Sequence, residues 1–113
     1  MPYIRIATSI ELNDAKKSEL LEAVAPLIAI LPGKNRDNAM VEIDDGKFMA
    51  LGDPSLPCVF VEVRLYRESP AEAKAEFAAE LNKVLANCFN LPPKHFYLNY
   101  MEMDHWGVDG RVV

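Results

Sequence analysis

Hydrophobic and polar positions alternate over the first residues of the chain and then change to a helical spacing. Residues 3–8 form a run rich in β-forming residues, with Ile4 and Ile6 on one face, which predicts a strand. Asn13 or Asp14 follows as a candidate helix cap. Beyond the cap, hydrophobic residues recur at intervals of one and three, the spacing of a single helical stripe: Leu20, Leu21, Val24, Leu27, Ile28 and Leu31.

Two prolines divide and end the predicted helix. Pro32 and Gly33 stop the hydrophobic stripe. Pro26 lies inside it, and an interior proline loses a backbone hydrogen bond at a cost of about 3 kcal/mol. We therefore expect a kink or a shorter final segment at that point. A second strand is predicted at residues 38–43, with a turn at residues 44–46.

The second half of the chain repeats this order after a long loop. Residues 58–66 give the strongest strand signal and are hydrophobic enough for a central position. Residues 69–72, Ser-Pro-Ala-Glu, predict a capping box at the start of a helix that ends near Asn90. The helix has its own hydrophobic stripe: Phe77, Ala78, Leu81, Val84, Leu85, Cys88 and Phe89. A last strand is predicted at residues 95–100.

The order strand, helix, strand, found twice, predicts an α+β fold in a single domain of 113 residues. The two βαβ repeats cover roughly residues 1–46 and 57–101, and residues 102–113 form a C-terminal tail. Right-handed crossovers give one four-stranded mixed sheet with both helices on one face. The other face, bearing hydrophobic positions such as Ile4 or Val63 according to register, then needs a cover. A symmetric oligomer supplies one.

Composition narrows the classes of function. The net charge of −5 argues against a nucleic-acid surface, since binding to phosphates needs clustered Lys and Arg. No hydrophobic stretch approaches the roughly 20 residues that span a bilayer, and no signal-peptide pattern is seen, so we expect cytoplasmic residence, with non-classical export left open. Cys58 and Cys88 are far apart, and His95 and His105 lack ligand spacing, so no metal is expected.

Pro2 directly follows the initiator methionine and heads the first predicted strand. If Met1 is removed, the chain begins with a secondary amine. An α-amino group has a pKa of about 8, so burial or a neighbouring cation can leave it unprotonated near neutral pH, where it can act as a base. Proline is also a natural first residue of an edge strand. Taken alone, the position of Pro2 favours a proline that only begins a strand over a catalytic one.

Five short motifs, in their order and spacing, extend through nearly all of the chain: Met1-Pro2, Pro32-Gly33-Lys34, Phe48-Met49-Ala50-Leu51-Gly52, Pro57-Cys58 and Phe96-Tyr97-Leu98-Asn99-Tyr100. With them the chain resembles the tautomerase superfamily, close to the macrophage migration inhibitory factor group. The resemblance implies a homotrimer with active sites between subunits. It also implies that Pro2 is the base of a cofactor-independent keto–enol tautomerase acting on a small 2-oxo acid of the phenylpyruvate type.

The resemblance also assigns residues around this base. Lys34 would depress the pKa of Pro2 and attract a substrate carboxylate. The alternative is a solvated lysine after a helix C-terminus, but its position in the Gly-Lys pair favours the functional interpretation. Tyr97 and Asn99 alternate onto one side of the last strand and would reach the pocket of a neighbouring subunit, where Asn99 binds a distal polar group. Packing between subunits is an equal alternative for Tyr97. Trp106 would form part of a hydrophobic pocket wall.

Some residues depart from the family pattern. Val61 stands where relatives carry a second cysteine, so thiol oxidoreductase chemistry is not expected. Arg64 and Tyr66 share a strand face by the period of two and place a cation and a phenol near the amine. Either could bind a carboxylate or narrow the pocket. Alternatively, Arg64 pairs with an acidic residue such as Glu62 of a neighbour or Glu42.

Two other functions remain open at this point, because a fold does not determine a function. One is a cytokine-like interaction protein with a vestigial pocket. The other is a hydratase or dehalogenase that acts on an unsaturated acid through a protonated Pro2, with Arg64 or Arg36 as an additional cation.

Overall fold

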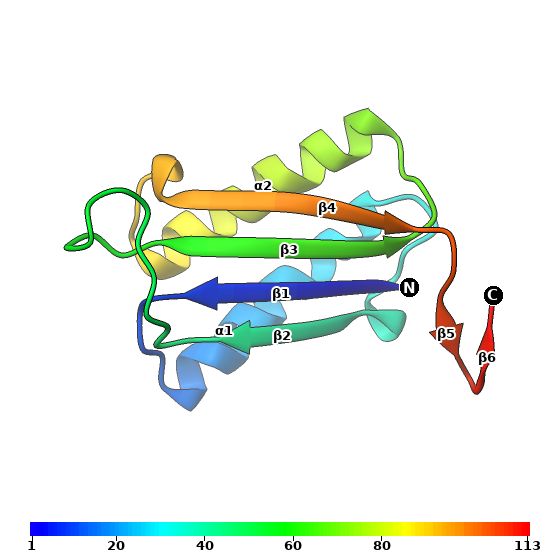
Figure 1. The fold of residues 1–113 in the computed structure, drawn as a ribbon, viewed down its shortest axis with the longest axis horizontal. Helices are drawn as coiled ribbons and strands as arrows, with labels where there is room; N and C mark the ends of the chain where they lie inside the picture. The colour runs from blue at the N-terminus through cyan, green and yellow to red at the C-terminus, as the bar shows by residue number, and fades with distance from the viewer.

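One four-stranded sheet, with the strand order β2-β1-β3-β4, forms the centre of the computed structural model, which describes all 113 residues (Figure 1). A separate two-stranded hairpin lies at the C-terminus. The elements are β1 (Pro2–Thr8), α1 (Asp14–Val24), the 3-10 helices η1 (Ala25–Ile30) and η2 (Arg36–Asn38), β2 (Met40–Asp44), β3 (Val59–Tyr66), α2 (Ala71–Phe89), the 3-10 helix η3 (Pro93–His95), β4 (Phe96–Met103), β5 (Gly107–Val108) and β6 (Arg111–Val112).

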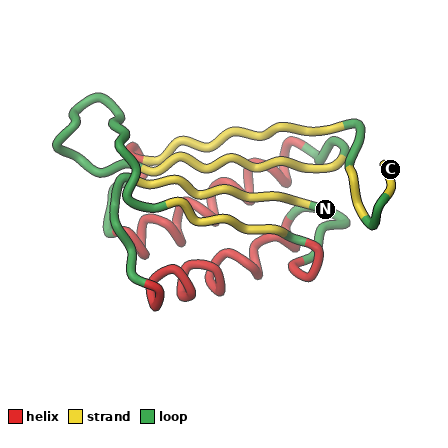
Figure 2. The backbone as a smooth tube through the Cα atoms, turned by 60° about the horizontal axis from the view of Figure 1, so that its bottom comes forward, coloured by secondary structure: helices red, strands yellow, loops and turns green.

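The pairing of the strands confirms the predicted mixed sheet. β1 pairs in parallel with β2 and β3 in parallel with β4, while the two central strands, β1 and β3, are antiparallel. Each parallel pair is joined by a helical crossover, and both helices cover the same face of the sheet (Figure 2). As a result, the start of β1 lies beside the ends of β3 and β4.

The first helical segment follows the predicted break at Pro26. Asn13 is the cap of α1, since its side-chain oxygen accepts a hydrogen bond from the backbone N–H of Lys16 at 2.8 Å. The α-helix ends at Val24, and a 3-10 helix continues from Ala25 to Ile30 with the proline at its start. A proline is tolerated there because an N–H in the first turn has no helical partner.

The predicted capping box at the start of α2 is wrong. The helix begins at Ala71, Pro70 occupies the cap position, and no side chain caps it. The Ser69 backbone N–H instead donates to the Glu102 carboxylate on β4 at 2.6 Å. This contact to β4 takes the place of the local cap. The helix ends at Asn90, which adopts the left-handed conformation with φ of 55°.

The hydrophobic core lies between the sheet and the helices. Alternate residues of β1 and β3 point into it, and Ile4, Ile6, Val63 and Leu65 are fully buried. Phe77 is a fully buried residue of α2 in the same cluster. No helix in the chain is both long and hydrophobic enough to cross a membrane.

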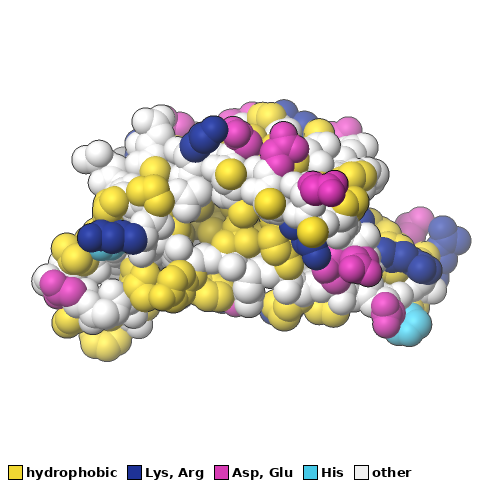
Figure 3. All heavy atoms as spheres, turned by 90° about the horizontal axis from the view of Figure 1, so that it is seen from above, with side chains coloured by type: hydrophobic (Ala, Val, Ile, Leu, Met, Phe, Trp, Pro, Cys, Tyr) yellow, Lys and Arg dark blue, Asp and Glu magenta, His cyan; other side chains and the backbone are white.

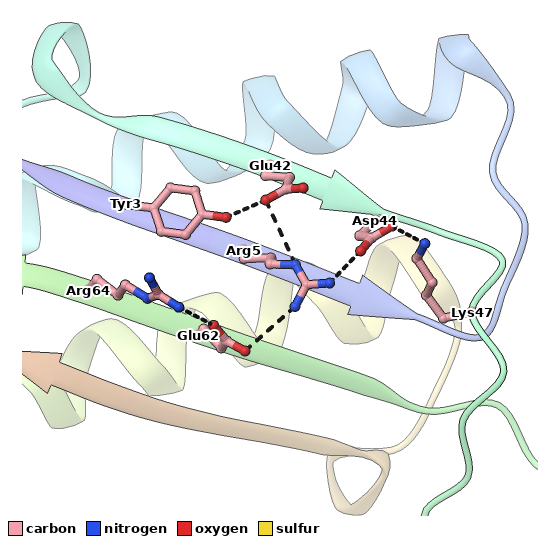
Figure 4. A network of polar contacts seen from close by, with 7 residues as sticks. All are labelled: Tyr3, Arg5, Glu42, Asp44, Lys47, Glu62 and Arg64. Carbon is pink, nitrogen blue, oxygen red and sulfur yellow. Dashed lines mark hydrogen bonds and ion pairs between the residues drawn. The ribbon is translucent and has the colours of Figure 1, made fainter.

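The other face of the sheet carries many charged side chains and is not the hydrophobic surface that was expected. Ile4 and Val63 point toward the helices, so they do not form a hydrophobic surface that needs a cover. This open face carries a network of charged and phenolic side chains from β2, β1 and β3, extended by Lys47 (Figure 4). We call it the open-face network, and its members are Tyr3, Arg5, Glu42, Asp44, Lys47, Glu62 and Arg64.

The C-terminal tail forms a hairpin, which the sequence analysis did not predict. Asp109 and Gly110 have φ angles of 56° and 75° and connect β5 to β6. Two consecutive residues with positive φ are typical of the type I′ turn, for which Asp-Gly is a preferred pair. The Asp109-Gly110 dipeptide was therefore the sequence signal from which this hairpin could have been predicted. The hairpin lies beyond the ends of β3 and β4 (Figure 1).

Candidate active site

A cleft of about 840 Å³ opens where the start of β1, the end of β4 and the C-terminal tail meet. The antiparallel pairing of β1 with β3 creates this site, because it brings Pro2 beside Leu65, whose other neighbour is Glu102. The lining residues come from both ends of the chain and from the η2–β2 and β3 segments between them: Met1, Pro2, Tyr3, Asn38, Met40, Arg64, Met103, His105, Trp106, Gly107 and Val108.

Met1, which carries the chain's amino group, lines this cleft. Met1 is half-buried, and Pro2 behind it is buried with its ring on the helix side of β1. Burial lowers the pKa of the Met1 amino group below its usual value of 8.0, and the nearby Lys34 ammonium lowers it further. Both effects disfavour the protonated form.

Lys34 is held at the edge of the cleft by a backbone contact. Gly33, with φ of 74°, turns the chain after the first helical segment. The Lys34 ammonium then donates a hydrogen bond to the Tyr66 carbonyl oxygen at 2.8 Å. Neither residue lines the cleft itself. Lys34 therefore acts on the amine through its charge, and the backbone of Tyr66 fixes its position.

Arg64 stands in the cleft wall and is 44% exposed. Its guanidinium contacts the Glu62 carboxylate of the same chain at 3.3 Å and lies over the Tyr3 ring, 5.5 Å from the centroid. Of the two alternatives for Arg64, the structure thus shows an acidic partner on its own strand. No carboxylate lines the cleft, and Arg64 is the only lysine or arginine that does.

Glu102 forms a second charged group behind the cleft, on the helix side of the sheet. Its carboxylate accepts hydrogen bonds from the Lys74 ammonium at 2.7 Å and from the Ser69 backbone N–H at 2.6 Å. The pKa of Glu102 is lowered, first by Lys74, then by Ser69, and also by the charge of Lys34. Glu102 therefore remains ionised and helps to place the start of α2.

Tyr97 and Asn99 lie away from the cleft within one subunit. They pair with Phe60 and Glu62 in the middle of the sheet, whereas Pro2 lies at the level of Glu102. At about 3.3 Å per residue along a strand, they are roughly 17 and 10 Å from that level. Both point to the open face, and Tyr97 is 57% exposed. Of the predicted site residues, the structure therefore brings together Pro2, Arg64 and Trp106, with Lys34 and Tyr66 adjacent.

Several lining residues were missed by sequence reasoning. Met40 reaches the cleft because the parallel pairing of β1 with β2 puts it beside Tyr3, and this register has no local sequence signal. Met103 extends the period of two beyond Met101, so a longer β4 would have revealed it. His105 lies between β4 and the C-terminal hairpin and had no pattern to assign it.

A family model settles the relationship that the motifs suggested. The model of the macrophage migration inhibitory factor (MIF) family matches residues 1–112. The chain belongs to the MIF family. Its predicted membership of the tautomerase superfamily, in the MIF-like group, and its predicted fold class are thereby confirmed.

Solved structures of MIF-like proteins share this fold at low sequence identity. Leishmania major MIF2 has a TM-score of 0.91 at 20% identity, covering 100% of this chain and 97% of that one. A MIF-like protein from Entamoeba histolytica has a TM-score of 0.86 at 17% identity, covering 99% and 98%. Pt0534, solved after inactivation by 2-oxo-3-pentynoate, has a TM-score of 0.78 at 18% identity, covering 89% and 85%. No curated protein matched in sequence.

Proposed function

We propose that this MIF-family chain is a cofactor-independent keto–enol tautomerase whose general base is the amine of Pro2, released by removal of Met1. The observation that carries the proposal is an amine placed in a cleft, where burial and Lys34 lower its pKa. After removal of Met1, the Pro2 nitrogen is the terminal amine beside the same lysine. A neighbouring positive charge favours the unprotonated form of such an amine, which is the form that acts as a base.

The reaction needs one proton acceptor that can also return the proton. The Pro2 nitrogen takes the proton of the enol hydroxyl and leaves an enolate. The oxygen electron pair then forms the C=O bond while the electron pair of the carbon–carbon double bond takes the proton from the protonated amine, which forms the new C–H bond and restores the free amine. The reverse sequence gives the enol. The positive charge of Lys34 favours the return of the proton and attracts an acidic substrate.

The lining of the cleft supports a small 2-oxo acid with a hydrophobic side chain. Its volume is in the usual range for small-molecule sites, roughly 300–1,000 Å³. Met40, Met103 and Trp106 supply a hydrophobic wall for a ring such as that of phenylpyruvate, and Arg64 supplies a cation. The inactivation of Pt0534 by 2-oxo-3-pentynoate, itself a 2-oxo acid, agrees with this substrate class.

We further propose that the active assembly is a homotrimer in which Tyr97 and Asn99 complete the cleft of a neighbouring subunit. Their distance from Pro2 within one chain supports this arrangement. Hydrophobic side chains also gather at the β4 edge next to α2 (Figure 3), where a groove is lined mainly by residues such as Leu81, Leu85 and Leu98. Light scattering in solution should give the mass of three chains, and a monomer at working concentrations would contradict the trimer.

The decisive experiment replaces Pro2 by Ala or Gly and measures enol-to-keto conversion of phenylpyruvate. The rate should fall by about a hundredfold or more, because general bases typically contribute 10²–10⁴-fold. Intact mass must first show that Met1 has been removed from the wild type and from each variant. Pro57→Ala is the matched control, since Pro57 precedes β3 just as Met1-Pro2 opens β1, and it should retain activity.

Full activity in a correctly folded Pro2 variant would overturn the mechanism.

The pH profile of the rate shows whether the Pro2 amine acts as a base or as an acid. A base role predicts a rate that rises with pH through the pKa of the Pro2 amine, which the neighbouring Lys34 charge should lower. A rate that falls with increasing pH would instead favour the protonated amine of a hydratase.

A further inference from the structure

Lys34 acts by its charge on the amine, whereas Arg64 is the cation that lines the cleft. The Lys34 ammonium is directed to the Tyr66 carbonyl oxygen, 2.8 Å away, and is outside the lining. Arg64 is in the lining, is 44% exposed and meets no carboxylate there. An acid that enters the cleft therefore meets Arg64 first.

The partner of Arg64 is itself shared between two arginines (Figure 4). Glu62 Oε2 lies 3.3 Å from Arg64 Nη2, and Glu62 Oε1 lies 3.6 Å from Arg5 Nη1. The two contacts use different oxygens. When Arg64 turns away from Glu62, the carboxylate keeps its contact with Arg5 and is not left without a cation.

Tyr3 provides an aromatic ring beneath the guanidinium of Arg64. The Arg64 side chain lies over the Tyr3 ring at 5.5 Å, and the Tyr3 hydroxyl donates a hydrogen bond to Glu42 on β2. The ring is thus anchored from both sides. A planar guanidinium stacked on an aromatic ring presents its N–H fork edge-on, in the geometry that suits a carboxylate.

We propose that Arg64 is the residue that binds the substrate carboxylate in the cleft. In the free protein the Glu62 carboxylate occupies Arg64 as an internal substitute for the substrate. The substrate carboxylate displaces Glu62, which stays paired with Arg5. The ligand class is a small monocarboxylic acid with a hydrophobic side chain. The proposal rests on the proposed function only in taking this cleft as the substrate site. Lys34 then acts on the amine, and binding of the acid is assigned to Arg64.

The test is a binding measurement that needs no turnover. 3-Phenylpropanoate and the uncharged 3-phenylpropanamide are titrated by calorimetry, and their cleft position is checked by amide NMR shifts. Arg64→Gln should weaken binding of the acid by about ten- to a hundredfold and leave the amide unaffected, since it removes a charged hydrogen-bond pair. Arg64→Lys should fall between, because it keeps the charge and loses the fork.

Lys83→Gln is the charge-matched control, since it removes a cation from the exposed side of α2 and breaks an ion pair with Glu80. It should leave binding of both compounds unchanged. If Arg64→Gln binds the acid as the wild type does, or weakens acid and amide equally, the assignment of Arg64 is wrong.

Glu62→Gln tests the role of the internal substitute. Removing its charge should tighten binding of 3-phenylpropanoate by roughly two- to fivefold, the range that an exposed ion pair is worth. In turnover of phenylpyruvate, KM should fall while kcat changes little. Weaker binding in this variant would contradict displacement. Unchanged KM in Arg64→Gln, with activity still dependent on Pro2, would overturn this proposal and leave the tautomerase intact.

Discussion

The two faces of the sheet use the same strands for different purposes. On the helix side, alternate residues of β1 and β3 are buried and hydrophobic, with Ile4, Ile6 and Val63 fully inaccessible. On the open side, their immediate neighbours Arg5 and Arg64 form ion pairs that remain partly in water. The buried face stabilises the fold through area removed from water. The open face positions the groups that surround the cleft.

The largest effect, a loss of stability, is expected from a substitution on the buried face of the sheet. Ile6→Ala should reduce the free energy of unfolding by about 2–5 kcal/mol, because it removes hydrophobic contacts and leaves a cavity in a fully packed core. Urea unfolding at constant pH measures the loss. A loss well below this range would mean that the helix side of the sheet is loosely packed, and the contrast between the two faces would fail.

The helices, the strands and their order could be predicted from the sequence, but not which residues of each strand face the helices. The period of two in the strands and of three and four in the helices indicated the elements, and the order of elements indicated parallel crossovers. The period of two does not say which residue set is covered. For that reason the sequence left open, according to register, whether Ile4 or Val63 lies on the face that in fact bears Arg5 and Arg64.

The open face could not be predicted, because its partners meet only through strand register. Tyr3 and Glu42 are 39 residues apart in the chain and become neighbours when β1 pairs with β2. The same cause explains why the predicted capping box is absent. The Ser69 backbone N–H donates to the carboxylate of Glu102, 33 residues away in the chain. Among the residues that line the cleft, Pro2 could be predicted from its position in the chain. Met40 could not, because it reaches the cleft only through the register of β2 against β1.

An intermediate loss of activity is expected from a substitution at Asn99, which the proposed trimer assigns to the cleft of a neighbouring subunit. Asn99→Ala should lower kcat/KM for phenylpyruvate by about tenfold, the loss of one hydrogen bond to substrate, with little change in stability. Mixing this variant with Pro2→Ala, by joint unfolding and refolding, should restore part of the activity. Some sites then combine a native Pro2 with a native Asn99 from the neighbour.

The control for this mixing experiment is each variant refolded alone, which should remain at its own low activity. An absence of recovery, in mixed assemblies shown by mass to have formed, would mean that each site takes both residues from one chain. The open face would then serve only its own subunit.

The smallest expected effect is at the centre of the open-face network. Arg5 contacts the carboxylates of Glu42, Asp44 and Glu62. Arg5→Met keeps the aliphatic stem and leaves three like charges close together. The loss of unfolding free energy should be clearly smaller than for Ile6→Ala, because these charges are in contact with water. Urea unfolding at low salt and at about 1 M salt, where the screening length is roughly 3 Å, measures it.

The salt dependence decides what Arg5 contributes. If its charge matters, the difference between wild type and Arg5→Met should shrink as salt screens the repulsion among the carboxylates. A difference independent of salt would assign the effect to packing of the side-chain stem. The same variant also deprives Glu62 of its second cation, so Glu62 should hold Arg64 more firmly and binding of 3-phenylpropanoate should weaken. In Arg5→Met the free energy of unfolding would then change little while the affinity for 3-phenylpropanoate falls measurably. This is the result expected if the charges of the open face position the residues of the cleft and contribute little to stability.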